Sequence, residues 1–248
     1  RRRHTRYWRD WSSDVCSSDL TKSVLLHDSE IDAPLYPTYL MDFGVFGRFY
    51  LALCHQLLGD SEGATRIAED AMRIAQAQPQ SHTLGFAMLA VFNIALLQNK
   101  CGEVKVMAAQ CLAFAKKHGF PEFAAMAKVA LGWAKSHESG NLEEGLAEML
   151  QGLESWAQTG FENWQAWFAV MIAEIQTRTG MHEKARNTAE TYLDRIRSNK
   201  EFVFEAPLLC ELAAALHGLN EDPNEVKAIF SKAIEKAERQ RARGWIER

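Results

Sequence analysis

The polar and apolar residues of this chain repeat with a period of about forty. Turn signals recur at Gly59-Asp60, Cys101-Gly102, Gly140-Asn141, Gly180-Met181 and Asn220-Glu221. After each turn, small or apolar residues stand at positions i, i+4 and i+7, which share one face of a helix. These positions are Ala64, Ala68 and Ala71; Val104, Ala108 and Cys111; Gly145, Met149 and Gly152; Ala185, Ala189 and Tyr192; and Val226, Phe230 and Ala233. Self-similarity of this kind predicts stacked repeats.

A second helical pattern precedes each turn. The predicted spans are 40–58, 82–99, 121–137, 161–178 and 203–218. Four spans carry a small residue 12 or 13 positions ahead of the next helix's first marker, namely Ala52, Gly132, Ala173 and Ala214; the second span has Phe92 there and Ala95 nearby instead. Small residues at a fixed place let two backbones cross closely. The sequence therefore predicts helical hairpins over residues 40–78, 82–118, 121–159, 161–198 and 203–243.

The residues at the predicted helix ends agree with this reading. Asn141 with Glu144 and Asp222 with Glu225 have the spacing of a capping box, and Pro223 suits a first helical position. Gly119, Gly160 and Asn199 are residue types that suit helix C-termini. The predicted fold is all-α, a right-handed α-solenoid of about five tetratricopeptide-like helical hairpins spanning residues 40–248. We expect residues 21–39 to be a loop and the remnant of a preceding repeat.

The first twenty residues follow no helical or strand period. A basic, Trp-bearing start is compatible with a nucleic-acid arm or a targeting peptide, although it lacks the apolar core of a secretory signal. A third interpretation is favoured, because Arg9 to Leu20 resembles a translated sequencing adapter and Arg1 to Arg6 resembles the far end of the same oligonucleotide. We therefore expect residues 1–20 to be artefactual and the natural chain to be cut before Thr21, so Cys16 enters no predicted site.

Charge and cysteine content narrow the function classes. The chain has a formal net charge of −4, and the first twenty residues hold five Arg and three Asp, so the remainder carries −6. An acidic chain is a poor binder of phosphate backbones, and no apolar run approaches the ~20 residues of a membrane span. Cysteines 54, 101, 111 and 210 form no CxxC pair and favour a reducing compartment. We expect a cytoplasmic protein that binds neither nucleic acid nor membrane.

No motif in the chain carries catalytic chemistry. There is no phosphate-binding GxxxxGK[ST] loop, and no two histidines after residue 20 have the i, i+4 spacing of metal ligands. Asp42-Phe43-Gly44 copies the magnesium motif of kinases, but none of the accompanying kinase signatures is present. The sequence predicts no catalytic, cofactor or metal site, and no enzymatic activity.

An aromatic cluster suggests where a partner could bind. Trp164 and Phe168 fit core positions, whereas Trp167 is turned away from them and falls near the concave groove by analogy with tetratricopeptide arrays. Exposed aromatic residues in grooves anchor partner peptides. The same register gives these candidate groove contacts: Phe49, Leu53, Gln56, Trp167, Glu174, Thr177, Arg178, Leu208 and Glu211.

Residues 132–160 resemble a known family. They match the C-terminal helical repeats of bacterial proteins that join a class III adenylate/guanylate cyclase domain, an ATPase domain and a tetratricopeptide-like array. The matching residues are Gly132-Trp133-Ala134, Gly140, Glu144-Gly145, Met149, Gly152-Leu153, Trp156 and Thr159-Gly160. The resemblance extends over residues 40–248 and implies a repeat array that lies downstream of catalytic domains.

Together these observations predict a non-catalytic interaction module of a multidomain bacterial signalling protein. The expected partner is a protein, a peptide or a neighbouring domain of the same chain, and we expect self-association through uncapped repeat ends. The alternative is the helical sensor region of a large ATP-binding LuxR-type transcription regulator, in which such an array binds a small inducer.

Overall fold

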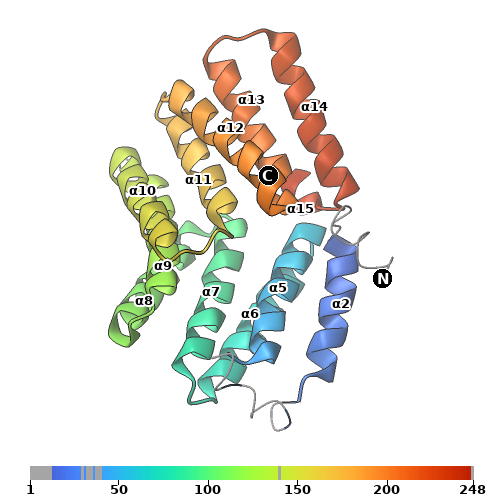
Figure 1. Ribbon diagram of the computed structural model, residues 1–248, viewed down its shortest axis with the longest axis vertical. Helices are drawn as coiled ribbons and strands as arrows, with labels where there is room; N and C mark the ends of the chain where they lie inside the picture. The colour runs from blue at the N-terminus through green and yellow to red at the C-terminus, as the bar shows by residue number, and fades with distance from the viewer. Residues whose placement is uncertain (1–12, 29–30, 32–35, 37–40, 139–140, 247–248) are drawn as a thin grey trace. The chain divides into compact units, whose positions relative to one another are not determined.

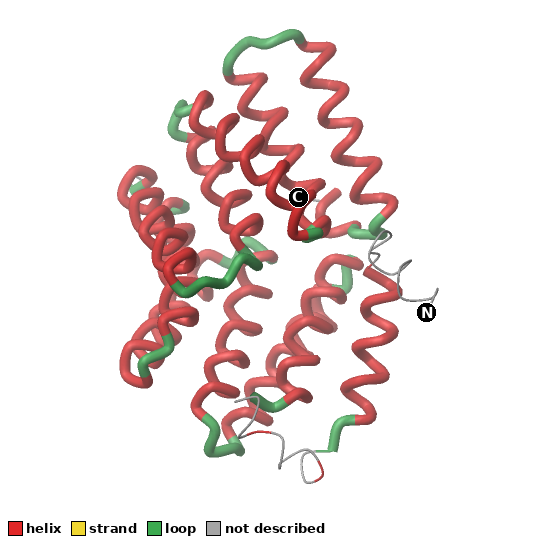
Figure 2. Tube along the Cα trace, viewed as in Figure 1, coloured by secondary structure: helices red, strands yellow, loops and turns green. Residues whose placement is uncertain are grey.

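A computed structural model describes residues 13–28, 31, 36, 41–138 and 141–246 of the chain, and this described part is helical with no strand (Figures 1 and 2). The helices are α2 (Ser13–Leu26), α5 (Phe43–Leu58), α6 (Ser61–Gln76), α7 (Ser81–Leu97), α8 (Cys101–His118), α9 (Pro121–Ser136), α10 (Leu142–Gln158), α11 (Gln165–Arg178), α12 (His182–Asn199), α13 (Glu205–Gly218), α14 (Pro223–Arg239) and α15 (Arg243–Ile246), with a 3-10 turn η2 (Phe202–Phe204). The prediction of an all-α helical repeat is confirmed.

Helices α5 to α14 follow one another as five consecutive pairs, at the places where the forty-residue period put them. The chemistry at the helix ends explains several boundaries. Asp222 accepts a hydrogen bond from the Asn224 N–H at the start of α14, and Pro223 occupies the first turn. Two expectations were wrong: Asn141 makes no side-chain capping bond, and Lys200 rather than Asn199 has the left-handed backbone (φ 64°) after α12.

The second helix of each pair buries one narrow stripe of small and apolar residues along its length. On α6 the stripe is Ala64, Ala68 and Ala71, with exposed fractions of 0 to 2%. The marker positions on α8 and α10 are buried as well. Two predicted members depart: Tyr192 is only half-buried, because the stripe of α12 passes to Leu193, and Phe230 on α14 is 39% exposed.

The first helix of each pair is enclosed on more than one side. Helix α5 packs against α2, α6 and α7, and α11 packs against α10, α12 and α13. Apolar residues therefore occupy most positions around these helices, in contrast to the single apolar stripe of a surface helix. The largest wholly buried side chains include Phe49 on α5, Phe92 on α7 and Trp167 on α11.

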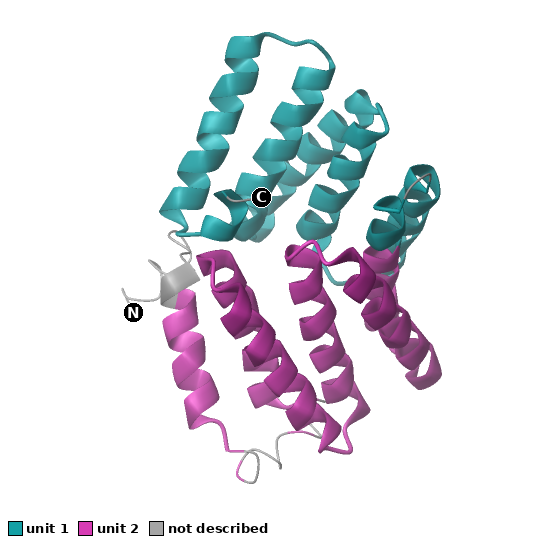
Figure 3. Ribbon diagram, turned by 180° about the vertical axis from the view of Figure 1, so that it is seen from behind, with its two compact units in different colours: residues 1–12, 132–248 teal, residues 13–131 magenta. Residues whose placement is uncertain are grey.

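The chain divides into two compact units, and the division falls inside α9 (Figure 3). We call residues 13–131, drawn in magenta in Figure 3, the first unit along the chain; it holds α2, α5, α6, α7 and α8. We call residues 132–248, drawn in teal, the second unit; it holds α10 to α15. In the second unit, α12 packs on α13 as well as on its own partner α11, and α14 packs on α13. The hairpin of α11 and α12 therefore packs through both of its helices on α13 of the next hairpin.

Two glycines let α9 and α10 cross closely in the second unit. A Cβ placed on Gly132 would lie 2.6 Å from the Gly145 carbonyl oxygen and 2.7 Å from the backbone nitrogen of Met149. A Cβ on Gly145 would lie 2.5 Å from the Gly132 oxygen. Real Cβ atoms do not approach backbone this closely, so both positions require glycine. The predicted role of Gly132 as a close-crossing residue is confirmed.

Helix α2 differs from the sequence expectation. Residues 13–26 form a helix that packs on α5, where we expected no regular structure up to residue 20 and, over residues 21–39, a loop and the remnant of a preceding repeat. Leu20 and Val24 are half-buried at i, i+4 spacing, and Val24 lies 3.2 Å from the Cβ position of Gly47 on α5. This short apolar face is enough to fold the segment against α5. Residues 1–12 lie outside the described part of the chain.

Asp42 begins α5 as a buried capping residue. Its carboxylate accepts hydrogen bonds from the Tyr36 hydroxyl (2.7 Å), the Gln78 amide (2.7 Å) and the Val45 N–H (2.9 Å). Burial raises the pKa of Asp42, but these hydrogen bonds and the nearby His27 outweigh it, so the pKa lies below its usual value. The Asp42-Phe43-Gly44 motif is thus the N-terminal cap of a helix.

Candidate interaction surface

The structure separates the nine predicted groove contacts into core and surface residues. Phe49, Trp167 and Leu208 are 1%, 2% and 0% exposed, and Gln56 is 8% exposed. As groove contacts these four are wrong, because the first helices that carry them are enclosed by neighbouring helices. The residues that retain accessible surface are Leu53, Glu174, Thr177, Arg178 and Glu211.

Trp167 belongs to an aromatic column inside the second unit. Its ring lies 5.9 Å from the ring of Phe204 and 5.6 Å from that of Trp245, centroid to centroid. Phe204 in turn lies 6.0 Å from Trp164. Trp164 and Phe168 are buried, as predicted. Trp167 therefore stabilises the packing of successive hairpins and offers no anchor to a partner.

Gln56 is engaged within the first unit. Its side-chain carbonyl accepts a hydrogen bond from the Gln98 amide (2.8 Å), and its own amide donates to the Ser61 hydroxyl (3.3 Å). Gln98 also donates to Thr65 (3.2 Å). This network joins the end of α5 to α6 and α7 and accounts for the polar residue at this buried position.

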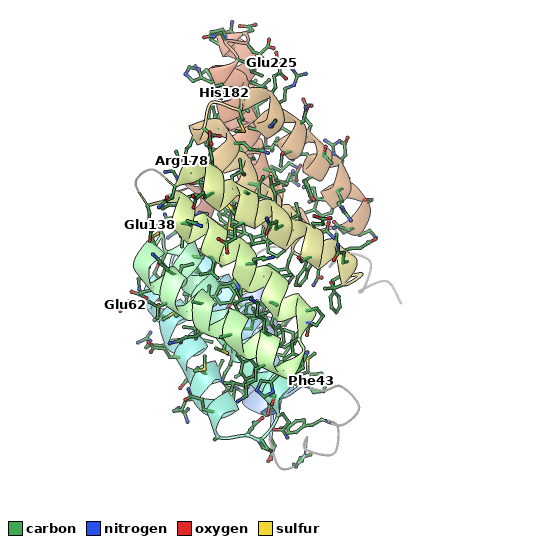
Figure 4. The ribbon with its side chains drawn as sticks, turned by 90° about the vertical axis from the view of Figure 1, so that its left-hand side faces the viewer. Phe43, Glu62, Glu138, Arg178, His182 and Glu225 are labelled. Atoms are coloured by element: carbon green, nitrogen blue, oxygen red, sulfur yellow. The ribbon has the colours of Figure 1, made fainter. Side chains whose placement is uncertain are left out.

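The remaining accessible residues gather at the C-terminal end of α11. Glu174, Thr177 and Arg178 are at i, i+3 and i+4, so they lie on one helix face. The Arg178 side chain is 40% exposed, and Figure 4 places it on the edge of the second unit, between Glu138 and His182. Of the predicted set, this is the group that the structure brings together on a surface.

His137 joins this group, although the sequence analysis did not predict it. The His137 Nε2 lies 2.9 Å from a terminal guanidinium nitrogen of Arg178 and 3.4 Å from Glu174 Oε1. Arg178 lies 3.8 Å from the same Glu174 oxygen. His137 and Arg178 are 41 residues apart, which is one repeat. Equivalent ends of neighbouring first helices therefore meet, and the repeat spacing was the one signal that could have found the pair.

The backbone of α9 fixes the orientation of the imidazole. The His137 Nδ1 lies 2.9 Å from the carbonyl oxygen of Trp133, and the two rings are 4.1 Å apart between centroids. Trp133 itself is wholly buried. His137 is thus held by a rigid aromatic base while its Nε2 faces the charged end of α11. We call His137, Glu174, Thr177 and Arg178 the α11 edge cluster.

A second charged group lies beside this cluster. Lys135 on α9 contacts the carboxylates of Glu144 (3.0 Å) and Glu148 (4.0 Å) on α10. Hydrogen bonding to Glu144 raises the pKa of Lys135, so the ammonium stays protonated at neutral pH. Lys135 is therefore paired with α10, although its side chain is about as exposed (39%) as that of Arg178 (40%).

A small cavity lies between α6, α7 and α8 in the first unit. Its volume is about 40 Å³, against the roughly 300–1,000 Å³ of ordinary small-molecule pockets. It is lined by Thr65, Ala68, Glu69, Val91, Ile94, Ala95, Gln98, Lys100, Glu103 and Met107. This space holds a guest of the size of a water molecule and does not suit an inducer.

Among the described residues, no three His, Cys, Asp or Glu side chains are grouped so that they could hold a metal ion. A separate finding concerns membranes: within the described part, none of the helices is both long and apolar enough to cross a bilayer.

Comparison with known proteins supports the fold. No protein-family model and no curated protein sequence matches the chain. Among solved structures, the chain is similar to the crystal structure of BtubC (BKLC) from P. vanneervenii, with a TM-score of 0.55 over 94% of this chain and 92% of that one. The two sequences are 16% identical. The likeness therefore establishes a shared helical architecture.

Proposed function

We propose that this chain is a non-catalytic interaction module, in which a stack of helical hairpins presents the α11 edge cluster to a protein or peptide. The observation that carries the proposal is the pair of partly exposed charged side chains, Glu174 (25%) and Arg178 (40%), on an otherwise enclosed first helix. Repeat arrays bind partners through the side chains that their packed helices hold in place.

The chemistry of the cluster favours a peptide with acidic groups. A guanidinium that is 40% exposed can form paired hydrogen bonds with a carboxylate, and a rigid base lowers the entropy lost on binding. Glu174 already lies near both His137 and Arg178, so a partner carboxylate would compete with it. Glu211 on α13 adds a further half-buried polar side chain within the same unit.

The kind of protein to which we assign the module follows from the family resemblance of residues 132–160. On that basis we place the array in a multidomain bacterial signalling protein with cyclase and ATPase domains upstream. The partner is then a separate protein or a neighbouring domain of the same chain.

Panning of a random-peptide display library on the purified chain tests the proposal. Selected peptides are measured by titration calorimetry against the wild type and Arg178→Ala. We expect the substitution to weaken binding by about tenfold, which corresponds to one charge-assisted hydrogen bond. The matched control is Arg197→Ala, since Arg197 is an exposed arginine of the same unit that lies on α12 and pairs with Asp194.

Three results would count against the proposal. They are failure to select any peptide, equal losses for the two arginine variants, and turnover of ATP or GTP by the purified chain. Binding of a small molecule in place of peptides would instead favour the sensor region of a transcription regulator.

A further inference from the structure

The contacts of His137 define its protonation state. A carbonyl oxygen accepts hydrogen bonds and cannot donate, so the nitrogen that contacts the Trp133 oxygen, Nδ1, carries a hydrogen. A guanidinium donates and cannot accept, so the nitrogen that contacts Arg178, Nε2, is bare. Both contacts are 2.9 Å long. The neutral imidazole with its hydrogen on Nδ1 satisfies both contacts at once.

Adding a proton to Nε2 makes this arrangement untenable. Two donors, both positively charged, would then face each other at 2.9 Å. An acceptor for the new N–H is at hand in Glu174 Oε1, 3.4 Å away. Histidine is the side chain whose charge ordinarily changes between about pH 5 and pH 8.

We propose that protonation of His137 transfers it from Arg178 to Glu174 and releases the Arg178 guanidinium from α9. The α11 edge cluster is then a proton-sensitive switch between two hydrogen-bonded states. While His137 is neutral, Arg178 ties the end of α11 to the end of α9. Once His137 is protonated, Glu174 makes that tie and Arg178 turns toward solvent.

The charges around His137 are consistent with this exchange. From α11 it faces Glu174 and Arg178, and on its own segment its neighbours are Lys135 and Glu138. From α10, Glu144 and Glu148 are directed to Lys135. Glu174 is thus a carboxylate within reach of the imidazole, and Lys135 is paired with carboxylates of α10.

The switch would regulate the proposed interaction surface. The release of Arg178 leaves a cation free for an acidic partner, so binding would strengthen as the pH falls. This consequence rests on the proposed function, whereas the exchange of hydrogen bonds rests on the contacts of His137 alone. The test below needs no partner, so its failure is distinct from a failure of the proposed function.

Double-mutant cycles at two pH values test the exchange. His137→Ala, Arg178→Ala, Glu174→Ala and the two double variants with His137→Ala are unfolded in urea at pH 8 and at pH 5.5. We expect the coupling between His137 and Arg178 to change the unfolding equilibrium by about two- to tenfold at pH 8 and to vanish at pH 5.5. The coupling between His137 and Glu174 should be absent at pH 8 and appear at pH 5.5. The matched control is Arg186–Glu190, an i, i+4 pair on α12 with a 3.2 Å contact and no histidine. Its coupling should be equal at both pH values.

Nitrogen NMR of the imidazole gives a second readout on the unmodified chain. We expect the Nδ1–H tautomer at pH 8 and a change in the Arg178 side-chain signals that follows the titration of His137. An Nε2–H tautomer at pH 8 would overturn the proposal. So would couplings that do not depend on pH, or Arg178 signals that stay constant through the titration.

Discussion

At the scale of single residues, backbone contact between α9 and α10 depends on two glycines, whose side chains are single hydrogen atoms. Gly132 and Gly145 face each other so closely that neither position has room for a methyl group. We expect Gly132→Ala to lower the free energy of unfolding by about 1–3 kcal/mol, because the clashing atoms belong to the backbone and cannot rotate away. Urea unfolding followed by circular dichroism measures the loss.

Gly102→Ala is the control for this prediction. Gly102 is exposed in the first turn of α8, and a Cβ there would meet no atom within 4 Å. Alanine has a higher helix propensity than glycine, so this variant should gain up to about 1 kcal/mol. Equal effects of the two substitutions would mean that the helices do not cross at Gly132.

The Asp42 carboxylate ties Tyr36 and Gln78 to the start of α5. Its pKa is depressed in the folded state, so its contribution to stability is present above about pH 4 and is lost as the pH falls through the folded pKa. We expect Asp42→Asn to lower the free energy of unfolding by about 1–3 kcal/mol at pH 7. The difference from wild type should shrink between pH 4 and pH 2.

Urea titrations at pH 7, 4 and 2.5 measure this difference. Asp70→Asn is the control, since Asp70 is an exposed residue of α6 in an ion pair with Arg73, and such pairs contribute about 0–1 kcal/mol. A deficit of Asp42→Asn that stays constant down to pH 2.5 would contradict the role assigned to the carboxylate.

Residue-level prediction from the sequence succeeded where a role depends on local spacing. Gly132 is such a case, because its place ahead of the following helix marks the crossing point. His137 was missed for the opposite reason: its partners Glu174 and Arg178 lie in the next repeat, and nothing in the sequence near residue 137 points to them.

At the scale of helices, the two members of a hairpin differ in how clearly their sequences show which face is buried. The second helices show one buried stripe, so their faces could be read from the spacing of small residues such as Ala64 and Ala68. The first helices are enclosed by neighbours and are apolar nearly all round, so the pattern does not say which side is accessible. The assignment of Phe49 and Trp167 to a groove failed for this reason.

Helix α15 is anchored chiefly by one residue. Trp245 is 8% exposed, packs against Trp167, and donates a hydrogen bond to the Val203 carbonyl oxygen (3.1 Å). We expect Trp245→Ala to cost about 3 kcal/mol or more, because it removes a buried ring and leaves a cavity beside Trp167. Thermal unfolding and urea unfolding both measure the loss.

Trp245→Phe separates the ring from its hydrogen bond. Phenylalanine keeps an aromatic contact with Trp167 and loses the donor to Val203, so the expected cost is about 1 kcal/mol. Losses of equal size for the two variants, or no loss for alanine, would show that α15 does not dock through this ring.

At the scale of the whole molecule, the forty-residue period accounts for five hairpins in two compact units, and the fold of residues 41–246 could be predicted from it. The period could not reveal the division inside α9, which depends on how densely neighbouring hairpins pack. It also gave no account of α2, which lies outside the repeat pattern.

The exposed apolar residues of α14 predict self-association. Phe230 and Ile234 are 39% and 48% exposed and lie one turn apart. We expect the apparent mass in light scattering to rise with concentration, and Phe230→Ser with Ile234→Ser to abolish the rise. Leu150→Ser is the control, because Leu150 is 44% exposed on α10 without an apolar neighbour of this kind. A wild type that stays monomeric at high concentration would contradict the prediction.

The central claim is that this helical array is a surface for contact, and hydrogen exchange of the chain with and without a selected peptide tests it most directly. The ends of helices open locally more readily than their centres, so a bound peptide is visible there as slower amide exchange. The account predicts slower exchange at residues 174–178 of α11 and 133–138 at the end of α9. Protection confined to the exposed faces of α12 and α14, or no change in exchange with saturating peptide, would contradict it.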